Sequence, residues 1–349
     1  MNTSPLSGPW RITFDTNPDD CNLNCIMCEE HSEYCADNNN RKNRRQHRLM
    51  DIELIRQTVE QMAPRGLREM IPSTMGEPLL YRYFEDIVRI SSKHGIKINL
   101  TTNGTWPRLG PQKWAEMLCP VTSDIKISWN GASPSTQEAI MPGSLFSQRL
   151  DDIYAFIKVR DDISRSGGNH CRLTFQCTFM ETNLDELPDI IRLAADLGVE
   201  RVKGHHLWVH SPQMQYLDMR RSAGSRSRWN MVVERCKDVA EHLQLPDGKN
   251  VILANFIPLA IEGKNVPDNW VCPFLGQEAW VNYEGRFDPC CAPDAKRREL
   301  GMFGYVTDGG MEAIWNGTKY RRFVQDHMKY PLCRGCNMRR PPEEVRCHD

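Results

Sequence analysis

The sequence has no long apolar run, almost no net charge and no recognisable targeting segment. No stretch reaches the ~18–20 apolar residues that a membrane span needs. The N-terminus lacks the basic start and apolar stretch of a signal peptide. A formal net charge of −1 gives no global signature of nucleic-acid or membrane binding. We therefore expect a cytoplasmic protein without a membrane segment, for which nucleic acid is an unlikely partner.

Internal repeats are also lacking, but cysteines are plentiful. With 349 residues, 40% of them apolar, the chain can form one large α/β unit and a smaller appendage. It contains 14 cysteines, and in a reducing cytosol clustered cysteines are more often metal or catalytic ligands than disulfides. Three lie between positions 21 and 28, six between 272 and 347, and five are scattered. This distribution predicts two separate cysteine sites.

Strand and helix patterns alternate regularly through the first part of the chain. Six strands alternating with helices predict an α/β fold with a parallel sheet, either doubly wound or a full or partial barrel. In each case the chemistry belongs at the C-terminal ends of the strands. The predicted strands are 10–17, 67–74, 97–103, 123–130, 172–179 and 201–209, and the predicted helices are 50–62, 82–94, 111–119, 149–163, 184–198 and 228–243.

The regular pattern ends after Leu245. Proline and glycine become frequent, and the predicted strands at 251–256 and 278–285 are short. We place a domain boundary near 245–250, which gives a core domain over 1–245 and a cysteine-rich domain over 246–349. The polar, basic segment 36–48 is predicted as a solvated loop, or alternatively as a basic lip that guides an acidic substrate or partner.

The first cysteine site is Cys21, Cys25 and Cys28, a C-x3-C-x2-C triplet directly after the first predicted strand. Three thiolates on a tight loop suit three irons of a 4Fe–4S cluster and leave the fourth iron open. An open metal position can bind and activate a small molecule, as in catalytic zinc sites. The alternative is a zinc site in which His31 or Cys35 supplies the fourth ligand.

This triplet resembles the hallmark of the radical S-adenosylmethionine (SAM) superfamily, and further motifs match in order over roughly residues 10–245. The resemblance implies a partial (β/α)6 parallel barrel that binds a 4Fe–4S cluster and SAM. In two motifs the chain departs from the family pattern, since Met75 replaces a glycine and Asn130 replaces an acid. The residues that the resemblance assigns to SAM binding are Met27, Gly76, Glu77, Pro78, Thr102, Asn103 and Ser128; Asn183, which follows strand five, could also bond SAM.

The resemblance also implies the chemistry. One electron from the reduced cluster cleaves SAM to methionine and a 5′-deoxyadenosyl radical, which removes a hydrogen atom from an unactivated substrate carbon. A reductant such as flavodoxin or ferredoxin would supply the electron. The protein must exclude water and hold the C–H bond within reach of the radical.

The second cysteine site has the spacing Cys272-x12-Gly285-x4-Cys290, followed by Cys333-x2-Cys336. It resembles the SPASM and twitch domains that are appended to many radical SAM enzymes. The cysteine count favours a twitch-type domain with one auxiliary 4Fe–4S cluster, for which the resemblance implies these four ligands. Cys291 and Cys347 are spare, and either could replace a ligand or help to hold a second cluster. A structural four-cysteine zinc site is the alternative.

Other residues near the predicted strand ends have two possible roles each. His205, His206 and His210 could contact SAM or transfer protons, or could have packing and surface roles. Glu181 lies at the same rim. The five scattered cysteines are typical of buried small residues, although epimerising relatives use a thiol as hydrogen donor. They are Cys35, Cys119, Cys171, Cys177 and Cys236.

The sequence thus predicts a radical SAM enzyme that modifies a C–H bond of a peptide or small natural product, with net oxidation favoured by the auxiliary cluster. A redox-neutral epimerisation or rearrangement is the alternative within this class. A zinc-dependent nucleic-acid module is the alternative from another class. The first strand begins near residue 10, so we expect no N-terminal peptide-recognition domain, and a peptide substrate would need its own means of docking.

Overall fold

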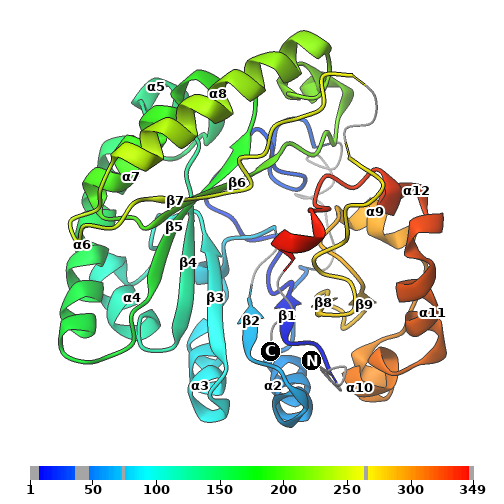
Figure 1. The fold of residues 1–349 in the computed structure, drawn as a ribbon. Coiled ribbons are helices and arrows are strands. Elements are labelled where there is room, and N and C mark those ends of the chain that lie inside the picture. Colours follow the sequence, from blue (N-terminus) through cyan, green and yellow to red (C-terminus); the bar gives the residue numbers. More distant parts are fainter. Residues whose placement is uncertain (1–7, 36–46, 73–74, 263–265, 346–349) are drawn as a thin grey trace. The chain divides into compact units, whose positions relative to one another are not determined.

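The computed structural model describes residues 8–35, 47–72, 75–262 and 266–345, which form two compact units (Figure 1). Unit 1 consists of Met1–Pro18, Arg48–Asn99 and Lys264–Asp349. Unit 2 consists of Asp19–His47 and Leu100–Gly263. The chain passes from unit 1 to unit 2 within strand β3 (Lys97–Thr102), so this strand contributes to both.

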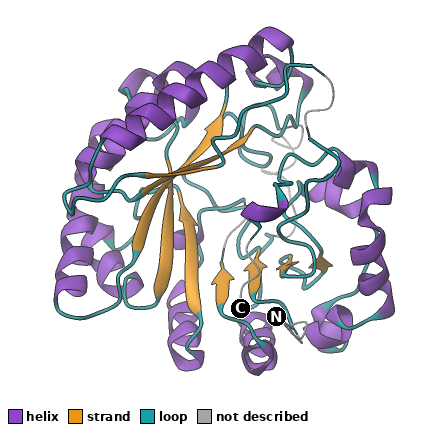
Figure 2. Ribbon diagram, viewed as in Figure 1, coloured by secondary structure: helices purple, strands orange, loops and turns teal. Residues whose placement is uncertain are grey.

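Unit 2 is an α/β unit with the strand order β7-β6-β5-β4-β3. The pairs β4–β5, β5–β6 and β6–β7 are all parallel, as crossover helices require. Strands and helices alternate along the chain (Figure 2). The elements are β4 (Thr122–Ser128), β5 (Arg172–Phe179), β6 (Arg201–His206), β7 (Ile252–Ala254), α4 (Gly110–Leu118), α5 (Pro134–Ile140), α6 (Phe146–Arg165), α7 (Leu187–Leu197) and α8 (Ala223–His242).

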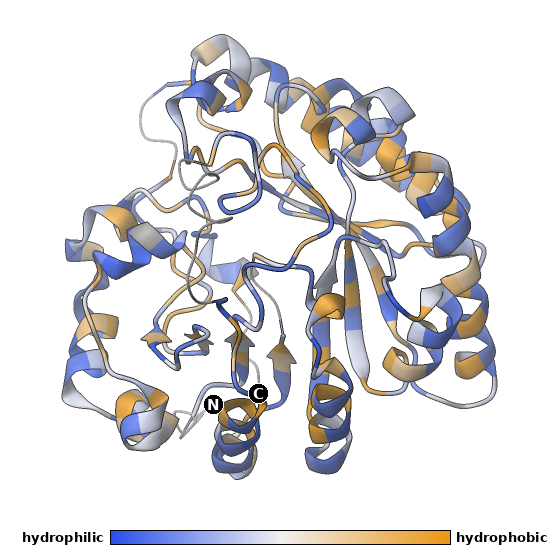
Figure 3. Cartoon of the chain, turned by 180° about the vertical axis from the view of Figure 1, so that it is seen from behind, coloured by the Kyte–Doolittle hydropathy of each residue, from blue (hydrophilic) through white to orange (hydrophobic). Residues whose placement is uncertain are grey.

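The two faces of the unit 2 sheet differ sharply in polarity. On one face, Ile127, Phe175, Val202 and Leu253 form a row across four strands. Helices cover this face. For example, Phe179 of β5 packs against Trp229 of α8, with their ring centroids 4.6 Å apart. The opposite face carries the polar residues of the same strands. Hydrophobic stripes on the helices complete the core (Figure 3).

Unit 1 joins strands from the N-terminal and the C-terminal parts of the chain in one sheet. Its strand order is β3-β2-β1-β8-β9, with β1 parallel to both β2 and β8, and β8 antiparallel to β9. Among the strands that the structure describes, the order does not close on itself in either unit. The elements are β1 (Arg11–Phe14), β2 (Glu69–Ile71), β8 (Glu278–Val281), β9 (Phe287–Asp288), α2 (Ile52–Met62), α3 (Phe84–His94), α9 (Asp294–Arg298), α10 (Gly310–Trp315), α11 (Thr318–Asp326) and α12 (Pro331–Arg334).

Local sequence explains where these elements begin and end. The side chain of Asp51 caps α2 by accepting a hydrogen bond from the backbone amide of Glu53. Helix α3 ends at Gly95, whose φ of 65° is the left-handed conformation that glycine adopts without strain. Short 3-10 helices complete the connections: Ala63–Arg65, Pro78–Leu80, Leu184–Glu186, Pro212–Leu217, Val306–Asp308, His327–Lys329 and Pro342–Glu344.

The predicted α/β class with a mostly parallel, open sheet is confirmed. All six predicted strands of the core are present, and β5 matches its predicted range residue for residue. Strand β7 lies beyond the boundary predicted near 245–250, yet it pairs with β6 inside unit 2. The division into domains 1–245 and 246–349 stays a prediction. No helix of the described chain is long and apolar enough to cross a membrane.

Candidate cofactor sites

The C-x3-C-x2-C triplet forms a partly buried loop of unit 2. Cys21, Cys25 and Cys28 are each partly buried, and no described cysteine forms a disulfide. The backbone amide of Cys28 donates to the carbonyl of Cys25, 3.0 Å away, which closes a tight turn. Burial, together with the neighbouring thiols, raises the pKa of Cys25 well above its ordinary value. Three free thiols that interact electrostatically on one loop suit three irons of a cubane cluster.

The loop is fixed to the segment that follows α5. The amides of Asn24 and Ile26 donate to the carbonyls of Pro142 and Ile140, at 3.1 and 3.0 Å. Gly143 has a φ of 94°, and a Cβ there would lie only 3.3 Å from the carbonyl oxygen of Asn22. The close approach of these two segments therefore requires glycine at this position.

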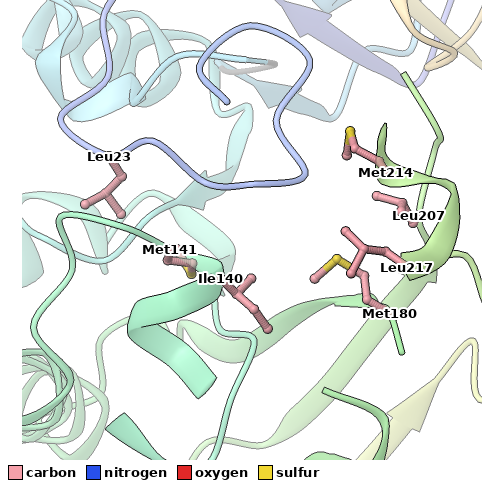
Figure 4. Close-up of a cluster of buried hydrophobic side chains, with 7 residues drawn as sticks. All are labelled: Leu23, Ile140, Met141, Met180, Leu207, Met214 and Leu217. Carbon is pink, nitrogen blue, oxygen red and sulfur yellow. The ribbon is translucent and has the colours of Figure 1, made fainter. Parts of the chain in front are cut away.

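A cluster of buried apolar side chains packs against the cysteine loop, and we call it the loop cushion (Figure 4). Cys21, Cys25 and Met27 are among the partly buried residues that contact it. The cushion excludes water from one side of the thiols, which favours a cluster that is sheltered from solvent. Its members are Leu23, Ile140, Met141, Met180, Leu207, Met214 and Leu217.

Asn103 links strand β3 to the cysteine loop. Its side-chain amide donates to the Oδ1 of Asn22 at 2.8 Å and lies 3.9 Å from the Sγ of Cys21. Its own Oδ1 accepts from the backbone amide and hydroxyl of Thr105. The hydroxyl of Thr102 accepts from the amide of Gly104, so the whole turn is fixed. Asn103 therefore helps to orient the side chain of Cys21.

Arg149, which the sequence analysis did not single out, is buried beside the same loop. Its guanidinium donates to the carbonyl of Ser128 at 2.6 Å and lies 4.7 Å from the ring centroid of Trp129. Only 2% of the residue is exposed. Its positive charge lowers the pKa of Cys25, against the larger effect of burial. A fixed cation at this position stabilises negative charge on the neighbouring cysteine thiolate.

Asn130 and Asn183 join the ends of strands β4 and β5. The side-chain amide of Asn183 donates to the carbonyls of Asn130 and Thr178, at 3.0 and 2.9 Å, and its Oδ1 accepts from Met180. The Oδ1 of Asn130 accepts from the amide of Thr178 at 2.8 Å. These contacts give Asn183 a positioning role in the strand ends, and its predicted contact with SAM stays a prediction.

Glu186 holds the turn after Asn130 through four hydrogen bonds. Its carboxylate accepts from the backbone amides of Ala132 and Ser133, at 2.6 and 3.1 Å, and from the hydroxyls of Ser133 and Thr136. Burial raises the pKa of Glu186, but these hydrogen bonds outweigh burial and hold it below its ordinary value. The carboxylate therefore caps α5 from outside the helix.

The predicted SAM-binding turn Gly76-Glu77-Pro78 belongs to unit 1. Glu77 is 2% exposed, and its carboxylate accepts from the backbone amide of Leu79, which starts a short 3-10 helix. The side chain of Asn17 donates to the carbonyl of Glu77 at 2.9 Å. Pro78 stands at the first position of that helix, where its missing N–H costs nothing. Thr74 lies outside the described residues.

The C-terminal cysteines gather within unit 1. Cys290 interacts electrostatically with Cys272, Cys333 and Cys336, and burial with these neighbours raises the pKa of Cys290 to about 12. Backbone amides donate to the sulfurs of Cys272, Cys290 and Cys336. Free thiols that interact electrostatically and accept amide hydrogen bonds are typical of iron–sulfur cluster ligands. Cys291 interacts with the same thiols, whereas Cys347 lies outside the described residues.

Arg339 is the second functional residue that the sequence analysis missed. It is 1% exposed and lies three residues after Cys336. Its guanidinium donates to the carbonyls of Pro267, Asp268, Trp270 and Arg334, at distances of 2.5 to 3.0 Å. It therefore fixes the segment before Cys272 to the Cys333–Cys336 turn.

The rim residues of unit 2 divide between packing and polar roles. His206 packs edge-on against Phe179 and Trp229, with centroid distances of 5.6 and 4.7 Å. His205 lies on the polar face, where its Nδ1 is 3.2 Å from the amide of Gln176. Glu181 forms ion pairs with Arg221 and Arg228, and His210 is exposed. Of the five scattered cysteines expected to be buried, Cys119, Cys171, Cys177 and Cys236 are buried, whereas Cys35 is only partly buried.

Comparison with known proteins agrees with both cysteine sites. Residues 18–166 match the model of the radical SAM superfamily, and residues 272–337 match that of the SPASM iron–sulfur cluster-binding domain. The chain is 22% identical over 345 residues to the tungsten-containing aldehyde ferredoxin oxidoreductase cofactor-modifying protein of Pyrococcus furiosus, covering 94% of this chain and 88% of that protein. It is 21% identical over 195 residues to the mycofactocin maturase MftC of Mycolicibacterium smegmatis, covering 56% of this chain and 43% of MftC.

A solved structure shares the fold. SuiB of Streptococcus suis, bound to its precursor peptide SuiA, aligns with a TM-score of 0.65 and 12% identity, over 95% of this chain and 70% of SuiB. At this identity the likeness shows the fold alone. It agrees with the predicted partial barrel.

Proposed function

This chain belongs to the radical SAM superfamily and carries a C-terminal SPASM iron–sulfur domain, and from that premise we propose that it modifies a C–H bond of a peptide or small natural product. When bound, the reduced 4Fe–4S cluster and SAM supply a 5′-deoxyadenosyl radical, which removes a substrate hydrogen atom. The observation that carries the proposal is the fixed triplet of Cys21, Cys25 and Cys28 on its loop cushion.

The residues of unit 2 would divide the work of cofactor binding. The three cysteine thiolates would hold three irons, and Asn103 would orient Cys21 through its amide. Arg149 would stabilise the cysteine thiolates through its buried positive charge, while Ser128 would face SAM. The loop cushion would keep water from the thiols. From unit 1, Gly76, Glu77 and Pro78 would hold the amino group of SAM, as the family pattern implies.

The cysteines of unit 1 would hold the auxiliary cluster. Cys272, Cys290, Cys333 and Cys336 supply four thiolates, which is the full ligand set of one 4Fe–4S cluster. An auxiliary cluster held by these residues would accept one electron from the substrate radical as that radical loses a proton, which supports net oxidation over a redox-neutral epimerisation or rearrangement. The electron donor would be flavodoxin or ferredoxin, in keeping with the predicted cytoplasmic location.

The related proteins support the general class of substrate. One curated relative is named as a maturase and another as a cofactor-modifying protein, and SuiB is solved with a precursor peptide. Peptide and natural-product modification is therefore the function we propose for this chain. The zinc-dependent nucleic-acid module is not proposed, because both cysteine regions match iron–sulfur families.

Anaerobic reconstitution with iron and sulfide counting tests the proposal. Wild-type protein should hold about eight irons, and a Cys21/Cys25/Cys28→Ala variant about four. With dithionite, only the wild type should release 5′-deoxyadenosine from SAM. Cys35→Ala, which alters a cysteine outside both motifs, is the matched control and should behave as the wild type. Bound zinc without iron or SAM cleavage would refute the proposal.

A further inference from the structure

The polar face of strands β4, β5 and β6 has an unusual composition. Strands of a parallel sheet are normally hydrophobic on both faces, since both are covered. Here the apolar face packs under helices, while the other face carries alternating polar and charged side chains. In chain order these are Asp124, Lys126, Ser128, Arg172, Thr174, Gln176, Thr178, Arg201, Lys203 and His205. A polar face of this extent indicates a binding surface.

Basic residues outnumber acidic residues in these three strands. Asp124 is the only acidic residue in β4, β5 and β6, whereas these strands carry four lysines and arginines. Both arginines, Arg172 and Arg201, pair with Asp124, and the hydroxyl of Thr174 donates to the same carboxylate at 2.8 Å. Arg201 and Lys126 help to hold the pKa of Asp124 low, against burial. The carboxylate of Asp124 is therefore already paired with Arg172 and Arg201 near the N-terminal ends of the strands.

A row farther along the strands, beyond that of Lys126, Thr174 and Arg201, leads toward the predicted SAM site. Ser128, Gln176 and Lys203 are register partners across three neighbouring strands. Since adjacent strands lie about 4.8 Å apart, the Cα atoms of Ser128 and Lys203 are roughly 10 Å apart. His205 stands two residues farther along β6, and its Nδ1 lies 3.2 Å from the amide of Gln176. Lys203, Gln176 and His205 thus lie on the same face of neighbouring strands, beside Ser128.

We propose that Lys203, Gln176 and His205 bind a carboxylate of the substrate and so hold its reactive carbon near Ser128. An ammonium, an amide and an imidazole on neighbouring strands can together donate several hydrogen bonds to one anionic group. Binding through a remote charged group is an effective way to orient a C–H bond for abstraction. This inference rests on the proposed radical SAM function, whose substrate class it narrows to acidic molecules.

Binding of matched peptides to the reconstituted, SAM-loaded holoenzyme tests the inference. The probes are the capped peptides Ac-Ala-Ala-Glu-Ala-Ala-NH2 and its Gln counterpart, together with free glutarate, measured by calorimetry. The Glu peptide should bind at least ~10-fold more tightly than the Gln peptide, which has nearly the same shape but no charge. Glutarate binding as tightly as the Glu peptide would identify a small acid, rather than a peptide, as the source of the carboxylate.

Variants of Lys203 test whether this residue causes the preference for the Glu peptide over the Gln peptide. Lys203→Met should remove the preference for Glu over Gln, and Lys203→Arg should keep most of it. Lys158→Met removes the same charge from an exposed position on α6 and is the control. Equal binding of both peptides to wild type, or an unchanged preference in Lys203→Met, would overturn the inference. Iron content and 5′-deoxyadenosine release from the same samples would show whether the radical SAM function itself holds.

Discussion

The side-chain amide of Asn103 lies 3.9 Å from the Sγ of Cys21 and donates to the neighbouring Asn22 at 2.8 Å. A residue from the end of β3 therefore fixes the first cysteine of a loop that begins about eighty residues earlier in the sequence. Hydrogen bonds to the groups around a metal ligand determine its orientation and affect the affinity of the site.

Asn103→Ala should weaken the SAM-binding cluster without unfolding the protein. The loss of this contact should speed the removal of about four irons by a chelator roughly 10-fold or more, because such supporting contacts typically contribute that much to metal affinity. Asn169→Ala is a matched control, since Asn169 also makes two hydrogen bonds, at the opposite end of the strands. Equal rates of iron loss in both variants would contradict this role.

Leu217→Ala should open a cavity in the loop cushion. Truncation of a buried leucine typically costs about 2–5 kcal/mol in unfolding free energy, which urea titration measures. Leu187→Ala, at an equally buried position on α7, should cost about the same. Only Leu217→Ala should also make the SAM-binding cluster more sensitive to oxygen. The measurement is the rate at which the visible absorbance of the cluster disappears in air. If the two variants bleach equally fast, the cushion does not protect the cluster.

Glu186→Gln should loosen the turn that follows Asn130. Loss of the charged acceptor should lower the free energy of unfolding by about 1–3 kcal/mol, since the four donors lose their best partner. We expect the KM for SAM to rise while kcat for 5′-deoxyadenosine release changes little. Glu234→Gln, on the exposed side of α8, is the control for the charge. A change in kcat alone would speak against a positioning role.

Arg339→Met should remove the auxiliary cluster selectively. The buried carbonyls that Arg339 satisfies would lose their donor, and each hydrogen bond to a charged group contributes about 1.5–3 kcal/mol. Iron should fall from about eight to about four per chain while SAM cleavage under dithionite persists. Arg334→Ala changes an exposed side chain of the same segment and should keep all the iron.

Alkylation of the metal-free protein should depend steeply on pH at the auxiliary site. Burial raises the pKa of Cys290 and of Cys333 to about 12, and only the thiolate reacts. Because the raised pKa lies above the working range, the thiolate fraction and the rate with iodoacetamide should rise about tenfold per pH unit from 7 to 10. The alkylation rate of glutathione, whose thiol is exposed to solvent, should reach its plateau at a lower pH. Peptide mapping by mass spectrometry gives the rates, and a plateau below pH 9 would contradict the burial effect.

The sequence predicted the order and type of the core elements well, because they follow local periodicity. Strand β5 and the helices around it have clear apolar stripes, and the cysteine motifs have diagnostic spacing. The pairing of β8 with β1 was not foreseen, since it joins segments some 270 residues apart and no local pattern encodes such a pairing. Helix α5, which supports the cysteine loop, was also missed, because it is only seven residues long.

The long-range hydrogen-bond partners of the site were harder to predict than the ligands. Arg149 did carry a signal, since it falls on the buried stripe of α6 together with Phe146, Ile153 and Phe156. A charged residue in an apolar stripe indicates a buried, paired cation. Arg339 and Glu186 gave no such signal, because their acceptors and donors come from backbone groups that only the folded chain brings near.

The sheet of unit 1 has a consequence for the order of synthesis. Strand β1 lies at the start of the chain, but its neighbour β8 begins only at residue 278. A ribosome must therefore translate beyond Val281 before β1 can complete its pairing. Contacts of such long sequence separation form late and slowly. The sheet of unit 1 is therefore completed late in synthesis, and iron can enter a finished auxiliary site only after Cys333 and Cys336 have emerged.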